Sequence, residues 1–162
     1  MTDIEGYVRT LTVITAVGAG VSAGVFLAFS SFVMKALGRL PAAEGISTMK
    51  AINEAAPTAS FMLPLFGTAA ACIALPIVAL RHLDQRWAAW LLTASLLYLA
   101  CVLLTIVYHV PRNNALALVD PRSPGAAQSW AHYLSHWTAW NHVRTGLALA
   151  ATTALILALR AG

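Results

Sequence analysis

The chain has 162 residues, of which 59% are hydrophobic and 10% are charged, and its formal net charge is +4. This length predicts one domain over residues 1–162, and the composition lies far outside that of soluble globular proteins. The basic residues are few and dispersed, so nucleic acid is not an expected partner.

Four apolar segments predict transmembrane helices, because a helix needs about 20 consecutive apolar residues to cross a bilayer. These segments cover about residues 10–37, 60–80, 87–110 and 128–159. The N-terminus carries two acidic residues before its first arginine, unlike a cleaved signal peptide, so we expect the first span to be retained. The sequence therefore predicts an integral, multi-pass membrane protein with an all-α fold, a transmembrane four-helix bundle.

The first loop contains a short amphipathic pattern. Pro41 is a typical helix start, and Ile46, Met49 and Ile52 follow at three-residue steps. This pattern predicts a short amphipathic helix that lies at the membrane interface or caps the bundle. Asn53 directly follows Ile52 on this helix.

The third span is predicted to end at Pro111, because proline lacks a backbone donor and stops a helix. The polar residues at this mouth of the span are His109, Arg112, Asn113 and Asn114. Residues 115–127 contain two prolines and a glycine and are expected to form a loop that leads into the fourth span.

The start of the fourth span carries the most unusual pattern in the chain. At about 100° per residue, seven aromatic or polar side chains within residues 130–144 share a helical sector roughly 140° wide. They are Trp130, Tyr133, His136, Trp137, Trp140, Asn141 and Arg144. His142 points to the opposite face, and residues 145–159 contain no charge. A polar, aromatic stripe therefore runs directly into a membrane span.

Four spans place both termini on one side of the membrane, together with the turn at residues 81–86. The other side receives the Asn53 segment, the polar mouth at residues 109–114 and the stripe at residues 130–144. We therefore expect these three polar regions to converge at one end of the bundle. Basic residues are nearly balanced between the two sides, and we expect the termini to be cytoplasmic.

The positions of the acidic residues disfavour two classes of membrane protein. All six lie in tails or loops, at Asp3, Glu5, Glu44, Glu54, Asp84 and Asp120. A proton-coupled transporter normally needs an ionisable group inside the membrane, most often a carboxylate, and a di-iron bundle needs several inward glutamates.

Three interpretations of the polar end remain. His132 and His136 have the i, i+4 spacing of metal ligands, and with His109 they would hold copper, iron or haem. The stripe would alternatively be an aromatic anchor, or the pocket of a non-catalytic protein that binds a quinone or lipid. The third interpretation is a reactive pocket for a flat, weakly acidic ligand such as a phenol, quinone or polycyclic ketone.

Three motifs carry a family resemblance. They are V-P-R-N-N-A-L at 110–116, W-x-x-Y-x-x-x-W-x-x-W-N-H-V-R-T at 130–145 and M-x-x-I-N at 49–53. Together they resemble the anthrone oxygenase-like family of small four-helix membrane proteins. The resemblance implies oxidation of an anthrone to an anthraquinone, with O₂ as co-substrate and no organic cofactor.

The motif positions that the resemblance carries over are Asn53, Asn113, Asn114, Trp130, Tyr133, Trp137, Trp140, Asn141 and Arg144. Position alone adds His109 and His136 as candidate bases, and Arg144 with Asn113 or Asn141 would stabilise an oxyanion. The remaining carried-over residues would contact the substrate. The expected partners are a small hydrophobic aromatic substrate and membrane lipid, and the sequence leaves open whether the chain forms a homo-oligomer.

Overall fold

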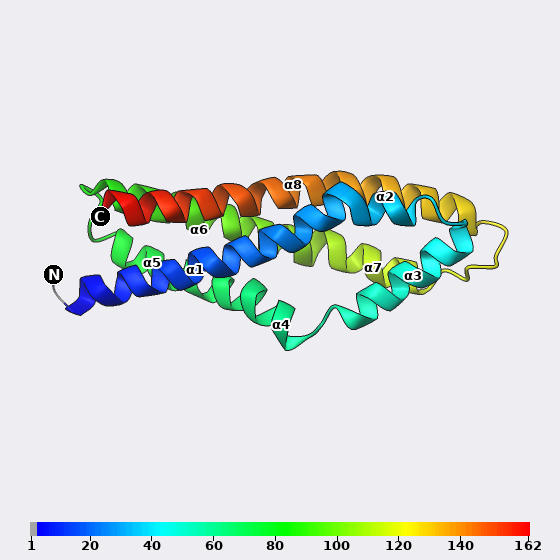
Figure 1. The fold of residues 1–162 in the computed structure, drawn as a ribbon, viewed down its shortest axis with the longest axis horizontal. Helices are drawn as coiled ribbons and strands as arrows, with labels where there is room; N and C mark the ends of the chain where they lie inside the picture. The colour runs from blue at the N-terminus through cyan, green and yellow to red at the C-terminus, as the bar shows by residue number, and fades with distance from the viewer. Residues whose placement is uncertain (1–2) are drawn as a thin grey trace.

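The computed structural model describes residues 3–162, and every regular element within them is a helix (Figure 1). In chain order these are α1 (Asp3–Ala28), η1 (Phe29–Val33), α2 (Met34–Leu37), α3 (Ala42–Ala55), α4 (Ala59–Met62), η2 (Leu63–Gly67), α5 (Thr68–Ala79), α6 (Arg86–Leu104), η3 (Thr105–His109), α7 (Val110–Ala117) and α8 (Ala126–Ala161). The η elements are single wide π-helical turns. The predicted all-α fold is confirmed.

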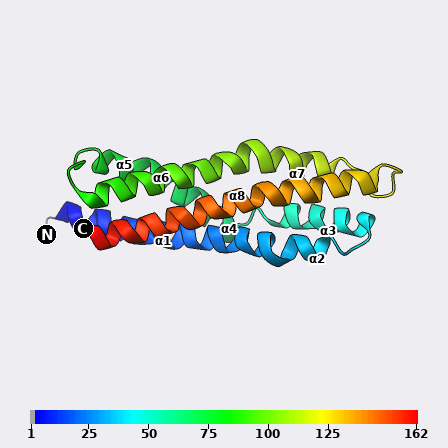
Figure 2. The ribbon, with the colours of Figure 1, turned by 90° about the horizontal axis from the view of Figure 1, so that it is seen from above.

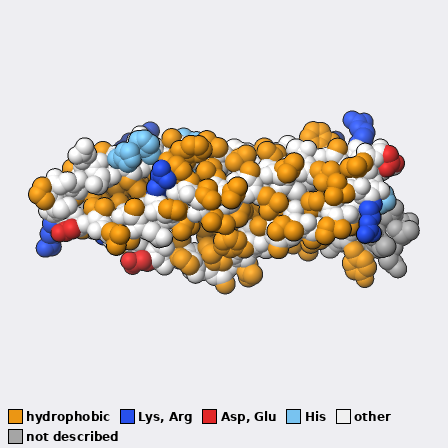
Figure 3. Space-filling view, turned by 180° about the vertical axis from the view of Figure 1, so that it is seen from behind, with side chains coloured by type: hydrophobic (Ala, Val, Ile, Leu, Met, Phe, Trp, Pro, Cys, Tyr) orange, Lys and Arg blue, Asp and Glu red, His pale blue; other side chains and the backbone are white. Residues whose placement is uncertain are grey.

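Four continuous helical stretches are long and apolar enough to cross a membrane. They are Gly6–Leu37, Ala59–Ala79, Arg86–Ala117 and Ala126–Ala161. Large apolar side chains on them point away from the bundle, for example Leu96, which is 72% exposed. Figure 3 shows hydrophobic side chains along the middle of the molecule and most charged ones toward its two ends. This surface is the one expected when lipid is the solvent.

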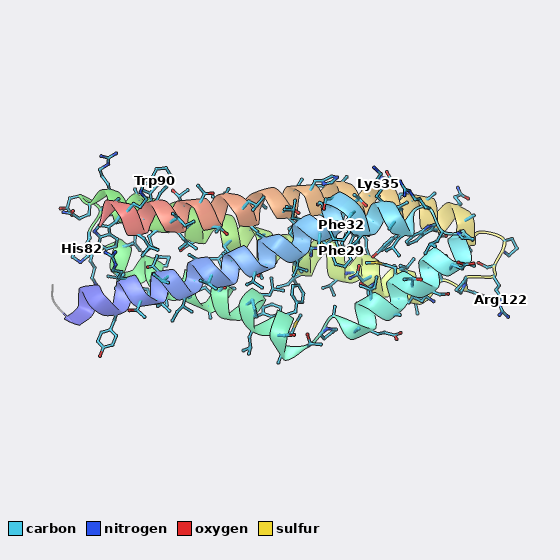
Figure 4. All side chains as sticks on the ribbon, in the orientation of Figure 1. Phe29, Phe32, Lys35, His82, Trp90 and Arg122 are labelled. Carbon is cyan, nitrogen blue, oxygen red and sulfur yellow. The ribbon has the colours of Figure 1, made fainter. Side chains whose placement is uncertain are left out.

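α8 is the central helix of the bundle. It packs along α6 and α1, and α5 packs against α6 and α1 (Figures 1 and 2). The termini and the α5–α6 turn lie at one end, where Figure 4 labels His82 and Trp90. α3 and the α7–α8 loop lie at the other end, beyond Lys35 and toward Arg122 (Figure 4). The predicted convergence of the three polar regions at one end is confirmed.

The bundle has two apolar cores of different character. The half near the termini is built largely from alanines and leucines, and Ala19, Ala23 and Ala148 are fully buried there. Such small residues let helix backbones approach closely where lipid gives no hydrophobic drive to associate. The other half is filled by large side chains, including Met34 and Trp130. The second core contains the polar end of the molecule.

The amphipathic helix of the first loop is confirmed as α3. Pro41 precedes its first turn, and Ile46 and Met49 are buried at 0% and 1% exposure. α3 packs against α8 and α7, so it closes the polar end of the bundle.

The predicted helix end at Pro111 is wrong. The third span continues through α7 to Ala117 because the π turn η3 directly precedes Pro111. The backbone N–H of Val110, the residue after η3, donates to the carbonyl of Thr105, five residues earlier. A wide turn of this kind accommodates the proline ring and its missing donor without ending the helix. Asn113 and Asn114 therefore lie on a helix and not in a loop.

The packing of α3 on α8 can be tested at Gly45. A Cβ atom at this position would lie 2.7 Å from two ring atoms of the buried Trp130 indole. Overpacking of this kind costs about 1–3 kcal/mol, so Gly45→Ala should lower the thermal unfolding midpoint of the detergent-solubilised protein. Gly146→Ala is the matched control, because a Cβ there has nothing within 4 Å. Equal midpoints for the two variants would contradict the packing of α3 on Trp130.

Candidate functional site

The polar end is built where two π turns flank α8. η1 contacts α8 directly, and η3 is joined to it through Arg144, whose Nη1 donates to the hydroxyl of Thr105 at 3.4 Å. Backbone carbonyls next to these turns accept side-chain hydrogen bonds, Phe26 before η1 and Leu104 before η3. Wide turns of this type recur at functional sites because they leave backbone groups open to other partners.

Arg144 is the central charge of this cluster. It is 6% exposed, and its Nε and Nη2 both donate to Oδ1 of Asn141, at 3.1 and 2.6 Å. The guanidinium lies over the ring of Phe26, 4.0 Å from its centre. A guanidinium has five N–H donors, and these hydrogen bonds together with the Thr105 contact use three. Two N–H donors therefore have no partner among the described residues and are available to a ligand.

Asn141 is fully buried and fully bonded. Its Nδ2 donates to the carbonyl of Phe26 and to the hydroxyl of Ser30, both at 2.8 Å. Both amide hydrogens are thus used, while Oδ1 accepts from Arg144. In this arrangement Asn141 holds Arg144 in place and ties α8 to the first span, and it has no donor of its own left for an oxyanion.

His109 is the buried histidine of the cluster. Its side chain is 1% exposed, and Nδ1 lies 3.4 Å from the carbonyl of Leu104. Because a carbonyl only accepts, this contact favours the tautomer with hydrogen on Nδ1. Nε2 then keeps a lone pair, and it has no hydrogen-bond partner among the described residues. The ring stands edge-on to Trp137, with centroids 5.1 Å apart.

Trp137 connects the two functional groups. The Arg144 guanidinium lies 5.4 Å from its ring centre, so the guanidinium and the His109 imidazole are both placed against one indole. Asn113 in turn fixes the indole, since its Oδ1 accepts from Nε1 of Trp137 at 2.9 Å and from the hydroxyl of Tyr133 at 2.8 Å. Trp130 stacks on Tyr133, with ring centroids 5.8 Å apart.

The seven residues of the predicted stripe do not all face inward. Five are buried, namely Trp130, Tyr133, Trp137, Asn141 and Arg144. His136 is exposed, and Trp140 is 42% exposed and lies against Tyr108. A helix buries only the side that its neighbours cover, which here is narrower than the predicted sector. Asn53 is half-buried on α3, and Asn114 is exposed.

The alternative metal set is not assembled. His132 and His136 stack on each other with ring centroids 4.0 Å apart, and both are exposed, whereas His109 is buried in the interior. Within residues 3–162 no three histidine, cysteine or acidic side chains come together in a way that could hold a metal ion. The structure therefore does not bring these three histidines together as one ligand set.

Unpaired polar atoms gather at the same end. Five buried side-chain nitrogen or oxygen atoms have no partner among the described residues: Asn53 Nδ2, Ser95 Oγ, Tyr108 Oη, His109 Nε2 and Thr138 Oγ1. Four of them belong to α3, η3 and the first half of α8. Buried polar groups without partners are rare, and a bound ligand or ordered water commonly accounts for them.

One comparison with known proteins identifies the family of the chain. Residues 56–154, more than half of the chain, match the family described as anthrone oxygenase. The chain belongs to the anthrone oxygenase family. No curated protein and no solved structure matches it. The chain is thus an oxygenase-like protein whose four long apolar helices are those of an integral membrane protein. His109, Asn113 and Arg144 all fall inside the matched part.

Several members of the cluster could not be singled out by the family motifs. Thr105, Ser30 and Tyr108 lie outside them, and Phe26 takes part through its ring and its carbonyl. Hydroxyl side chains within apolar spans are a signal for interhelical hydrogen bonds, and this signal would have marked Ser30 and Thr105. Nothing in the sequence marks the carbonyl of Phe26.

Asn141→Ala should destabilise the protein strongly. It removes the acceptor for two N–H groups of a buried guanidinium, and an uncompensated buried charge costs about 3–5 kcal/mol. The double variant Asn141→Leu with Arg144→Met should be more stable than the single one, because no unpaired charge remains. Thermal or denaturant unfolding in detergent measures both, with the exposed Asn114→Ala as control. If Asn141→Ala is as stable as the double variant, Asn141 does not hold the Arg144 guanidinium in place.

Proposed function

We propose that this member of the anthrone oxygenase family oxidises a hydrophobic phenolic or anthrone-like substrate with O₂, using His109 as base and Arg144 as the group that stabilises the oxyanion. The observation that carries the proposal is the pairing of an unpartnered His109 Nε2 with a partly unpartnered guanidinium on one indole, Trp137. A base and a positive charge held side by side are what proton removal next to a carbonyl requires.

The surroundings of Arg144 support its role. Its partners are the amide of Asn141 and the hydroxyl of Thr105, which accept hydrogen bonds without cancelling the positive charge. Every carboxylate whose side chain the structure describes is exposed. The charge is therefore available to an enolate or phenolate oxygen, and in a site without water such an interaction is far stronger than in bulk solvent.

The proposed reaction begins when Nε2 of His109 takes one of the two hydrogens of the ring CH₂ group as a proton. The electron pair of that C–H bond delocalises onto the substrate oxygen beside Arg144. The resulting carbanion forms a carbon–oxygen bond to O₂, and the peroxide receives the proton from His109. Loss of the second C–H proton then breaks the O–O bond, forms a carbonyl and releases water. One O₂ thus converts CH₂ to C=O plus H₂O, with no external reductant.

The site is closed in this structure. Trp137 and Arg144 are 3% and 6% exposed, and two cavities of about 460 and 290 Å³ among the described residues are not lined by either residue. Substrate binding therefore requires the aromatic side chains around Trp137 to move apart. An aromatic substrate would replace ring–ring contacts with equivalent ones, which limits the free-energy cost of opening.

Loss of the base or the charge should remove catalysis and leave the fold in place. Removing one donor to an oxyanion lowers kcat by about 10²–10³, and removing a general base by about 10²–10⁴. We expect Arg144→Gln and His109→Gln to fall in these ranges when the purified protein is offered anthrone under O₂ and quinone formation is followed by absorbance. A variant Arg144→Gln that keeps full activity would overturn the assignment.

His136→Gln and His142→Gln are the matched controls. Both histidines are exposed on α8, and His136 is the alternative base predicted from the sequence. If His109 is the base, both variants should keep the activity of the unmodified protein. If only His136→Gln loses activity, the base lies on the outer face. Tryptophan fluorescence that responds to anthrone without turnover would identify a binding protein instead of an oxygenase.

A further inference from the structure

The outer surface of the polar end holds a cavity that the proposed reaction does not use. It has a volume of about 290 Å³, lies between α7 and α8, and is lined by Arg112, Leu116, Ser129, His132, Tyr133 and His136 among others. Three of these side chains can carry a positive charge, and no acidic residue within the described chain lines the cavity. On the face shown in Figure 3, histidine side chains form a patch beside a basic side chain at this end.

Arg112 has most of its donors free. Its guanidinium carbon lies over the ring of Tyr108, 3.4 Å from the centre, and Nη1 makes one long hydrogen bond of 3.4 Å to the carbonyl of the same residue. The stacking fixes the plane of the guanidinium, so its edges stay available to a planar or tetrahedral oxyanion. The guanidinium is therefore held in place, but most of its N–H donors have no hydrogen-bond acceptor among the described residues.

The two histidines form a second, adjoining donor group. Their rings stack with centroids 4.0 Å apart, and Nδ1 of His136 lies 3.0 Å from the carbonyl of His132, to which it can only donate. The nitrogen of His136 left for a ligand is thus Nε2.

The depth of this group relative to the membrane identifies the kind of anion. Tyr108 and the half-exposed Trp140 pack together with centroids 4.9 Å apart, in the manner of an aromatic belt at a membrane interface. Arg112 and His136 each lie four residues beyond this pair, which is about 6 Å further along their helices. The headgroup layer occupies roughly 5–8 Å beyond the hydrocarbon on each side of a bilayer. The two backbone positions fall within this layer, and the Arg112 guanidinium reaches back over the Tyr108 ring. Its charge therefore lies at the depth of the aromatic pair, and the rings of such a belt sit at the headgroup level.

Below the aromatic pair, the surface of the same helices is apolar. Ile106 is 49% exposed, Val107 is 59% exposed and Val143 is 48% exposed. Such a surface suits acyl chains and not a water-soluble ligand. A basic pocket between two transmembrane helices, directly above an apolar face, is the arrangement that binds acidic lipid headgroups.

We propose that the cavity between α7 and α8 binds the phosphate group of an anionic phospholipid, with Arg112, His132 and His136 as the residues that hold it. A free phosphate ion offers the same oxyanion chemistry, but it would gain nothing from the apolar face below. This site is separate from His109 and Arg144, so it stands or falls independently of the proposed reaction.

The test uses the full chain reconstituted in vesicles of equal parts phosphatidylglycerol and phosphatidylcholine, followed by native mass spectrometry of the lipids that stay bound. The unmodified protein should retain phosphatidylglycerol preferentially. Because one basic residue near a membrane surface contributes about 1 kcal/mol, Arg112→Gln should lower this preference about fivefold, and His132→Gln with His136→Gln should lower it similarly. Lys35→Gln, which removes an exposed cation at the same end, should leave it unchanged (Figure 4).

Three results would overturn the assignment. The first is an equal retention of both lipids by the unmodified protein, and the second is an unchanged preference in Arg112→Gln. The third is complete displacement of phosphatidylglycerol by inorganic phosphate, which would show that a soluble anion occupies the cavity. The variant Arg112→Lys keeps the charge without the planar guanidinium, and its preference should lie between those of the unmodified protein and Arg112→Gln. Circular dichroism of each variant confirms that the loss is not one of folding.

Discussion

A positive charge held inside an apolar bundle is the constraint on which the polar end of this protein depends. Arg144 is buried, and a carboxylate would be its simplest partner, yet the group that holds it is the neutral amide of Asn141. The amide satisfies N–H donors and leaves the net charge intact, which an ion pair would not do. Structural stability alone would favour neutralising the charge. Its retention is what an anionic intermediate would require.

The π turns explain how a neutral amide can hold a buried guanidinium. Asn141 supports Arg144 with its oxygen because its nitrogen has acceptors in the first span, the carbonyl of Phe26 and the hydroxyl of Ser30. An ordinary helix uses its carbonyls internally and offers few to a neighbour. The turns η1 and η3 widen the helix on either side of α8, and η3 also carries both Thr105 and His109. The irregular backbone is tolerated at this depth because it is buried in protein.

The sequence predicted the spans, the convergence of the polar regions and the inward-facing core of the stripe, because all three follow from helical periodicity and from the number of crossings. It could not predict which edge of the stripe is covered, since that depends on where η1 and α3 lie. His136 and Trp140 therefore fall outside the interior. The π turn before Pro111 was also invisible to periodicity. An extra residue per turn rotates everything after it, and this rotation brings Asn113 to Tyr133 and Trp137.

The boundary of the family match divides the site in an informative way. His109, Asn113, Trp137 and Arg144 lie within residues 56–154, whereas the ring of Phe29 that packs on Trp137, at 5.6 Å between centroids, lies in the first span. α3, which closes this end of the bundle, also lies outside the match. The groups that would carry the chemistry thus lie within the matched residues, and part of the wall around them lies outside the match. The side chains that line a pocket select the shape of the substrate, whereas its charged and basic groups determine the reaction. Membership of the family is therefore a stronger argument for the type of reaction than for the identity of the aromatic substrate.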